Sequence, residues 1–488
     1  MITARDEAVA GRADPRTSVR WALASLSLSM LLSSLGTSIA NVGLPTLAEA
    51  FEASFQEVQW VVLAYLLAVT TLIVSVGRLG DITGRRRLLL GGIFLFTVAS
   101  VLCGVAPTLW LLIAARAAQG LGAAIMMALT LAFVGETVPK ARTGSAMGLL
   151  GTMSAIGTAL GPSLGGVLIA GPGWRAIFLV NVPLGILTFV LAHRHLPLDR
   201  PGPKADRAGF DPVGTLLLAL TLAAYALAVT VHPDAGRGSF GPLNVALLLA
   251  SVLGLGLFVL VEARAASPLI RLSMLRVPVL SAGLAASALV STVIMATMVV
   301  GPFYLSLALG LDAARVGLVL AVGPLVVALT AAPAGRIADR FGARRMTTVG
   351  LVGMAAGASM LSMLPATLGI PGYIAPIVVV TAGYALFQTA NNTAVMADIG
   401  PDQRGVVSGM LNLSRNLGLI TGASVMGAVF AFASATTDVT TARPESVATG
   451  MRTTFAVAAA LIVIALAIVA GAWRRTLRER EPAPRTVN

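Results

Sequence analysis

The chain is 488 residues long, and 57% of its residues are hydrophobic while only 11% are charged, against about 25% charged residues in a typical soluble domain. A soluble fold cannot bury so much apolar surface, whereas a bilayer can, so we expect an all-α integral membrane protein. The net charge of +13 is spread over many short segments, which argues against nucleic-acid binding. The single cysteine, Cys103, excludes an internal disulfide and a cysteine metal site, and we expect no metal or other cofactor.

The membrane spans are the first elements that the sequence predicts. A helix needs about 20 mostly apolar residues to cross a hydrocarbon core of about 30 Å. Residues 1–20 carry four arginines and no apolar run, which predicts a cytoplasmic N-terminal tail. Fourteen apolar segments follow, near 21–44, 58–77, 88–106, 109–133, 144–170, 176–193, 212–230, 243–261, 279–305, 313–333, 346–364, 372–396, 405–432 and 453–473.

Basic residues are distributed unequally between the two predicted sides of the membrane. With the N-terminus inside, 27 Lys and Arg residues lie in inner loops and tails, five lie in outer loops, and two lie within spans. Because basic residues concentrate in cytoplasmic loops, and because the number of spans is even, we expect both termini in the cytoplasm.

An internal repeat divides the chain into two halves. Residues 77–87 match residues 335–345 at six of eleven positions, 258 residues apart. Residues 139–142 and 401–404 form a second matched pair. A third correspondence consists of spaced glycines, Gly157, Gly161 and Gly166, which recur as Gly418, Gly422 and Gly427. Such duplication is typical of transporters whose substrate site lies between the repeats.

The repeat offset predicts how the spans are grouped. It equals eight spans rather than six, so two helices are inserted between two six-helix bundles. We expect an N-terminal bundle over residues 21–195, a linker with the two inserted helices over 196–277, a C-terminal bundle over 278–473 and a cytoplasmic tail over 474–488.

Several motifs resemble those of the major facilitator superfamily. Residues 77–87 resemble its signature loop, and residues 116–122 resemble its arginine motif. Residues 41–45 and 59–65 resemble the fourteen-helix drug:proton antiporters of the EmrB/QacA type. The segment that resembles the antiporter motif contains Gly157, Gly161, Pro162, Gly165 and Gly166. The resemblance implies two bundles that alternate access, and export of amphiphilic compounds against proton entry.

Two acidic residues are candidates for a conformational gate. Asp81 and Asp339 lie beside arginines, including Arg85, at the predicted inner membrane edge. The repeat places Asp81 near Arg404 and Asp339 near Arg142, each at the N-terminus of a helix of the other half. A carboxylate at such a place gains about 0.3–1 kcal/mol, and up to about 2 kcal/mol when partly buried. The alternative is that these loops serve only as topology signals.

The antiporter-like segment also has an ordinary structural interpretation. Pro162 removes a backbone hydrogen bond and is expected to bend the fifth span. Its small neighbours allow close helix packing, whether or not the segment takes part in transport.

Arg116 and Arg415 are predicted near the middle of spans four and thirteen, where a charged side chain costs at least about 2.5–3.5 kcal/mol. We expect them to line a central cavity, or alternatively to bond neighbouring carbonyls and amides and so hold helices together. The other predicted lining residues are polar or aromatic: Ser34, Thr37, Asn41, Tyr65, Gln119, Tyr384, Gln388, Asn391 and Asn392. Each of these can instead bond a neighbouring helix.

The chain departs from the family pattern at Gly36, where members typically carry an acidic residue. None of the 21 acidic residues is predicted in the middle of a span, and most are assigned to loops or tails. We therefore expect neutral or anionic rather than cationic substrates. Proton coupling would use carboxylates near the inner edge, with Asp81, Glu136 and Asp398 as candidates.

These observations predict a secondary active exporter of hydrophobic or amphiphilic small molecules. We expect it to be proton-coupled and monomeric, in a bacterial cytoplasmic (inner) membrane. A bacterial source is suggested by a composition rich in Arg, Ala and Gly in which Lys140 and Lys204 are the only lysines. The alternatives are a dedicated exporter of one endogenous metabolite or lipid, and a sensor or receptor that has lost transport. No nucleophile–base pair or phosphate-binding loop indicates an enzyme.

Overall fold

The computed structural model describes residues 15–137, 143–199, 211–230, 241–265, 272–363, 365–397, 404–434 and 442–480. All regular elements in these ranges are helical. Thirteen of the described helices are long and apolar enough to cross a membrane, and the segment Pro212–Ala228 is a shorter apolar helix. The predicted all-α membrane architecture is therefore confirmed. The remaining predicted span, at 212–230, corresponds to α9 (Pro212–Thr230), whose 19 residues measure about 28 Å.

The N-terminal bundle contains six long helices and two short ones. They are α1 (Pro15–Val42), α2 (Leu44–Ala50), α3 (Phe55–Thr83), α4 (Arg85–Val105), α5 (Leu109–Thr137), α6 (Thr143–Ala170), α7 (Ala176–Leu179) and α8 (Asn181–His195). The start of α3 is fixed by a capping box, because the Ser54 amide donates to Glu57 Oε2 at 2.8 Å and the Glu57 amide donates to Ser54 Oγ at 3.3 Å. We call the end of the molecule where α2 and α7 lie the α2 end; the sequence predicts that it faces outward.

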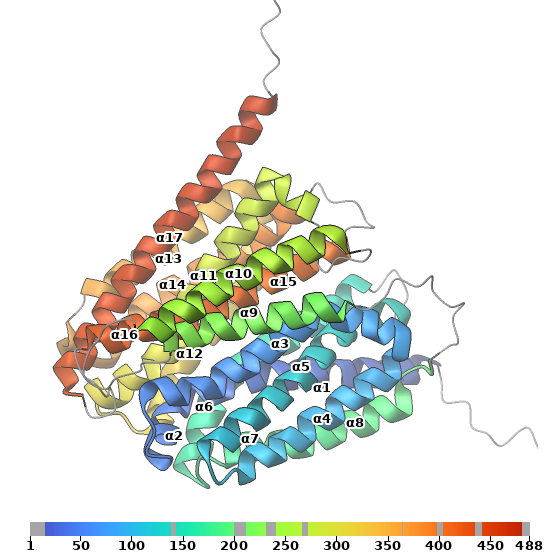
Figure 1. The fold of residues 1–488 in the computed structure, drawn as a ribbon, viewed down its shortest axis with the longest axis horizontal. Helices are drawn as coiled ribbons and strands as arrows, with labels where there is room; N and C mark the ends of the chain where they lie inside the picture. Colours follow the sequence, from blue (N-terminus) through green and yellow to red (C-terminus); the bar gives the residue numbers. More distant parts are fainter. Residues whose placement is uncertain are drawn as a thin grey trace, which may run out of the picture.

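The C-terminal bundle repeats this arrangement with added irregular turns. It contains η2 (Leu272–Arg276), α11 (Pro278–Phe303), η3 (Tyr304–Ala308), α12 (Ala313–Phe341), α13 (Ala343–Met363), η4 (Ala366–Leu368), α14 (Gly369–Met396), α15 (Arg404–Thr421), η5 (Gly422–Met426), α16 (Gly427–Ala433) and α17 (Pro444–Arg480). The turns η3 and η5 are π-helical, so α15, η5 and α16 form one continuous segment. In Figure 1 the red α17 projects beyond the other helices, and it continues past the span predicted at 453–473.

The two signature segments end their helices in the same way. Gly84 has φ 95° and Gly342 has φ 87°, a backbone conformation that favours glycine. The amide of Gly84 donates to the Gly80 carbonyl and that of Gly342 donates to the Ala338 carbonyl, both at 2.9 Å. The expectation that these segments are loops is therefore wrong for most of their length. Since α3 and α12 continue to these glycines, residues 81 and 339 lie in their last turns.

The inserted helix α9 runs along α3 (Figure 1) and is bonded to it near both ends. The indole nitrogen of Trp60 donates to Thr230 Oγ1 at 3.2 Å. Near the other end, the hydroxyls of Ser75 and Thr215 are 2.7 Å apart. These two contacts attach α9 to the N-terminal bundle along most of its length.

The same helix also reaches the C-terminal bundle. Tyr225 on α9 lies near Thr421 at the end of α15, and α9 contacts the following turn η5. The second inserted helix, α10 (Pro242–Arg264), packs on α9 and leaves Val252 and Leu253 largely exposed. Because apolar side chains of a membrane protein can face lipid, α10 marks the lipid side, and α9 covers a seam between the two bundles.

Candidate functional site

Arg116 of α5 is completely buried, and its guanidinium is hydrogen-bonded to carbonyl oxygens of the protein. The guanidinium donates from Nε to the Val61 carbonyl of α3 at 2.9 Å, and from Nη2 to the Gly36 carbonyl of α1 at 3.0 Å. Nη1 donates to Gln119 Oε1 at 2.5 Å. Hydrogen bonds to a charged group are the stronger kind, so this arginine ties three helices together.

Tyr65 and Gln119 complete the same buried network. The Arg116 guanidinium lies 4.3 Å from the centre of the Tyr65 ring, a cation–π distance. The Tyr65 hydroxyl donates to the Ser33 carbonyl at 2.8 Å. The Gln119 amide donates to Ser100 Oγ of α4 at 2.7 Å. In this conformation Tyr65, Gln119 and Arg116 present no appreciable surface to a cavity, which agrees with the helix-bonding alternative.

The predicted lining residues of α1 bond mainly within the N-terminal bundle. Ser34 Oγ lies 2.7 Å from Ser154 Oγ of α6. Thr37 donates to the Ser33 carbonyl at 3.0 Å, and Asn41 donates to the Thr37 carbonyl at 3.1 Å. The buried Oδ1 of Asn41 has no hydrogen-bond partner among the described atoms, so this amide retains an acceptor.

The predicted lining residues of α14 are more accessible. Tyr384, Gln388 and Asn392 are half-buried, and Gln388 Nε2 donates to Asn392 Oδ1 at 3.4 Å. Asn391 differs, because it is buried and donates to the Gly283 carbonyl of α11 at 3.2 Å.

Arg415 of α15 contrasts with Arg116. Its side chain is half-buried, and no hydrogen bond or ion pair joins it to another residue in the described part of the chain. Since both arginines lie well inside long helices, their position along the helix does not explain the difference. The neighbouring helices supply partners to one and not to the other.

The glycines of α6 bring this helix against α1. A Cβ atom on Gly157 would lie 2.5 Å from the Leu31 carbonyl oxygen, and one on Gly165 would lie 2.7 Å from Val42 Cγ1. A Cβ on Gly161 would overlap Ser38. Real side chains essentially never approach so closely, so only glycine permits this separation of α1 and α6.

The adjacent face of α6 contacts the other bundle. A Cβ on Gly166 would lie 2.5 Å from the Ala313 carbonyl oxygen and 3.0 Å from Gly317 Cα, both in α12. A Cβ on Gly317 would in turn meet the Pro162 carbonyl. The antiporter-like segment therefore makes two kinds of contact: one side packs against α1 of its own bundle, and the other packs against α12 of the other bundle.

The C-terminal bundle repeats these contacts. A Cβ on Gly422 would lie 2.5 Å from the Thr292 carbonyl oxygen of α11, and one on Gly427 would overlap the Gln59 amide of α3. Thr292 Oγ1 donates to the Gly418 carbonyl at 3.1 Å. In the first bundle, Ser38 Oγ donates to the equivalent Gly157 carbonyl at 3.3 Å. The sequence repeat is thus matched by a repeat of packing and hydrogen bonding.

An aromatic cluster that the sequence analysis does not predict lies at the α2 end. The Phe55 ring at the start of α3 is 4.7 Å from the Phe303 ring and 5.5 Å from the Phe430 ring, measured between centroids. All three side chains are fully buried. They join the two bundles at the same end as the glycine contacts.

Most of the predicted gate and proton-coupling residues lie outside the described residues. The side chains of Asp81, Asp339, Glu136 and Arg404 do so, and Arg142 and Asp398 lie wholly outside the described ranges. The gate and the coupling sites therefore remain predictions. Arg85, the remaining member, is half-buried at the start of α4.

A carboxylate at a helix N-terminus does occur in the described part, at a residue that the sequence analysis does not single out. Asp199 accepts the backbone amides of Arg86 at 2.8 Å and of Arg87 at 3.2 Å, at the start of α4. It follows α8 in a Pro- and charge-rich stretch, and that composition was the only available signal.

Glu262 corrects the assignment of the remaining acidic residues to loops and tails. It lies inside α10 and is 2% exposed. A Cβ on Gly214 of α9 would lie 3.0 Å from Glu262 Oε1. The apolar run ends at Val261, but the helix continues to Arg264. A helix boundary predicted from hydropathy alone therefore comes too early.

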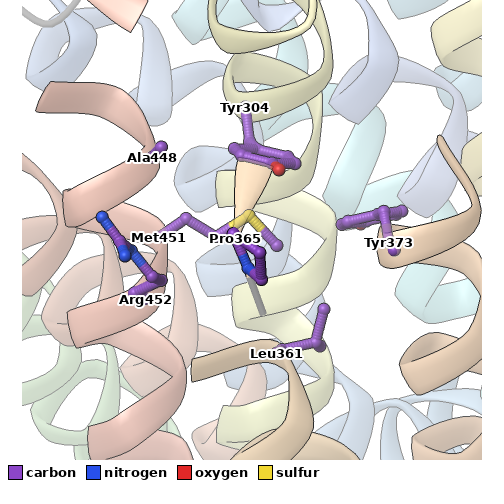
Figure 2. A pocket seen from close by; sticks show the side chains of 8 residues that line it. Tyr304, Leu361, Pro365, Tyr373, Ala448, Met451 and Arg452 are labelled. Carbon is purple, nitrogen blue, oxygen red and sulfur yellow. The ribbon is translucent and has the colours of Figure 1, made fainter. Parts of the chain in front are cut away.

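One small pocket lies within the C-terminal bundle and is separate from these sites. Figure 2 shows Tyr304, Tyr373, Met451 and Arg452 around it, and the two tyrosine rings are stacked with centroids 6.0 Å apart. All of its lining residues belong to one bundle, so this pocket is not part of a pathway between the two bundles.

Two pseudo-symmetric helical bundles, joined by reciprocal glycine contacts, define the class of the protein as a membrane transporter. The sequence profile of the Major Facilitator Superfamily matches residues 26–423. The chain therefore belongs to the Major Facilitator Superfamily.

Relatives support the membership and differ in the substrates their names state. The uncharacterized transporter YebQ of Escherichia coli is 32% identical over 405 residues, covering 83% of this chain and 88% of the relative. The riboflavin transporter RibZ of Clostridioides difficile is 30% identical, covering 83% and 87%. The multidrug resistance protein Stp of Mycobacterium tuberculosis is 31% identical, covering 84% and 75%.

A solved structure has the same fold. A bacterial homologue of the human lysosomal transporter Spinster, in an inward-facing and unoccupied conformation, aligns with a TM-score of 0.70. The alignment covers 96% of this chain and 99% of that one, at 16% sequence identity. At this identity the likeness shows the fold alone.

Proposed function

We propose that the protein is a secondary active exporter of hydrophobic or amphiphilic small molecules that works by alternating access. In this proposal it resides in a bacterial inner membrane with fourteen spans and both termini in the cytoplasm. It belongs to the fourteen-helix drug:proton antiporter branch, acts as a monomer and exchanges substrate for protons. Asp81, Glu136 and Asp398 are the candidates for proton coupling, and Asp81, Arg85, Asp339, Arg142 and Arg404 form the inner gate.

The observation that supports this mechanism best is the reciprocal contact of the two bundles at the α2 end. Gly166 meets α12 at Gly317, and Gly427 meets α3 at Gln59. Neither contact contains an ion pair between described residues. Surfaces of this kind can separate and re-form without leaving a buried charge unpaired, which a rocking motion of two rigid bundles requires.

The names of the relatives bear on the substrate class. The name of Stp, a multidrug resistance protein, favours efflux of several compounds. The name of RibZ, a riboflavin transporter, favours the alternative of a protein dedicated to one metabolite. A sensor that binds a ligand without moving it is the remaining alternative.

Substrate-dependent proton flux in proteoliposomes tests the proposal. Purified protein is reconstituted in vesicles that contain a pH-sensitive dye, an acidic interior is imposed, and neutral, anionic and cationic amphiphiles are added in turn. We expect several of them to accelerate loss of the proton gradient in proteoliposomes but not in empty vesicles. Acceleration by one metabolite alone would favour the dedicated exporter. Binding without movement of either substrate or protons would contradict the export function.

A further inference from the structure

The contacts of α15 establish which way its polar residues face. Ser414 Oγ donates to the Leu284 carbonyl of α11 at 2.5 Å, and Gly418 packs on Ser291 of α11. Thr421 lies near Tyr225 of α9. Ser414, Gly418 and Thr421 lie within about 60° of one another around the helix, so this one side of α15 faces α11 and, near its end, α9.

The polar residues lie on the side away from α9. An α-helix turns about 100° per residue, so Asn412, nine residues before Thr421, lies on the opposite side of α15. Arg415 and Asn416 follow Asn412 by three and four residues, a spacing that places them on the same face. Since α9 and α10 lie on the lipid side of the seam, this face points away from lipid and into the space between the bundles.

The two mid-span arginines differ in what they can still bind. All three nitrogens of the Arg116 guanidinium already donate to the protein. Arg415 is half-buried and makes no hydrogen bond or ion pair within the described part of the chain. A guanidinium presents a planar set of donors that fits a carboxylate or sulfonate with two parallel hydrogen bonds. Because Arg116 is completely buried, Arg415 is the one of the two whose donors a ligand can reach.

We propose that Arg415 recognises an anionic group on the substrate, and that the transported amphiphiles include aromatic or aliphatic carboxylates and sulfonates. This assignment rests on the proposed export function, since it places Arg415 in the substrate pathway. Asn412 and Asn416 flank the arginine and supply neutral polar contacts. The same charge disfavours cationic amphiphiles, because no acidic side chain is predicted in the middle of a span.

A matched pair of fluorescent probes tests the assignment by binding. The anion 1-anilinonaphthalene-8-sulfonate and the neutral N-phenyl-1-naphthylamine share one aromatic skeleton. Binding is measured to the full-length protein in lipid nanodiscs, with empty nanodiscs subtracted. Arg415→Gln should weaken binding of the sulfonate about tenfold or more, equivalent to about 1.4 kcal/mol. It should leave the neutral probe within about twofold, and Arg415→Lys should retain part of the sulfonate affinity.

The control variant is Arg336→Gln, which removes the same charge from an exposed position of α12 and should change neither probe. Equal weakening of both probes by Arg415→Gln, or no weakening of either, would overturn the assignment. Transport of the two probes in proteoliposomes separates this result from the export function. Selective loss of sulfonate binding without transport of either probe would contradict export and support the role of Arg415. Transport of both, slowed equally by Arg415→Gln, would contradict the role of Arg415 alone.

Discussion

Each bundle carries one arginine in the middle of a membrane helix, and the two have opposite surroundings. Arg116 is enclosed by carbonyls of α1 and α3, the Gln119 amide and the Tyr65 ring. Arg415 lies half-buried on a polar face without a described partner. The comparison shows that a charge at membrane depth does not by itself indicate a binding site, because a fully buried, hydrogen-bonded arginine stabilises helix packing while a partly exposed one can bind ligand.

The largest expected effect concerns stability. Arg116→Ala leaves the Gly36 and Val61 carbonyls and the Gln119 amide without their donor in a buried site. We expect it to lower the free energy of unfolding by about 3 kcal/mol or more, since each unsatisfied buried group costs about 1–3 kcal/mol. Arg415→Ala should cost less than about 1 kcal/mol. Thermal unfolding in detergent measures both, and similar losses in the two variants would remove the distinction between the arginines.

The second prediction compares the pseudo-equivalent glycines of the two bundles. A Cβ on Gly166 meets the α12 backbone, which cannot move without shifting the helix. A Cβ on Gly427 meets the end of the Gln59 side chain, which can rotate away. We expect Gly166→Ala to reduce transport by about tenfold or more and Gly427→Ala to reduce it less than about threefold, because backbone overlap forces larger shifts than side-chain overlap. Greater loss in Gly427→Ala would mean that the α6–α12 contact is not the limiting one.

The third prediction compares a carboxylate placed next to Arg116 with a carboxylate that replaces Arg415. A Cβ on Gly36 would lie 3.1 Å from the Tyr65 hydroxyl and 3.3 Å from the Phe96 ring, so Gly36→Asp adds charge inside a packed core next to Arg116. We expect its carboxylate to be neutralised there and ethidium export to change little. Arg415→Asp should instead raise the apparent affinity for ethidium about tenfold, since it reverses the charge that faces the pathway. The opposite ranking in a dye-efflux assay would place the pathway charge at Arg116.

The smallest expected effect concerns the matched aspartates of the two signature segments. Asp81→Asn and Asp339→Asn each remove a charge at the predicted inner gate. We expect transport to fall several-fold while the dissociation constant for substrate stays within about twofold, because one charge near a helix N-terminus is worth about 0.3–1 kcal/mol. Parallel binding and transport assays distinguish the two effects. Equal loss of binding and transport would argue against a gate.

Much of the fold can be predicted from the sequence, for a physical reason. The cost of unsatisfied backbone groups in lipid requires apolar helices of about 20 residues, and these are visible as hydropathy. Helix ends are less predictable, because backbone hydrogen bonding continues through charged residues until a glycine such as Gly84 or Gly342 adopts a positive φ. The sequence also cannot indicate that carbonyls of Gly36 and Val61 converge on Arg116, since every residue has a carbonyl and only packing selects these two.

Rocking of the two bundles requires their contacts at the α2 end to open during each transport cycle. Cross-linking in a Cys103→Ser background tests this opening. Phe55→Cys with Phe303→Cys spans the two bundles, and a short bis-methanethiosulfonate can join them. Ser34→Cys with Ser154→Cys, whose side chains touch within the N-terminal bundle, is the matched control. We expect the first cross-link to stop transport reversibly and the second to leave the rate within about twofold, as rocking of two rigid bundles requires. Unaltered transport with Phe55→Cys and Phe303→Cys fully cross-linked would contradict the account.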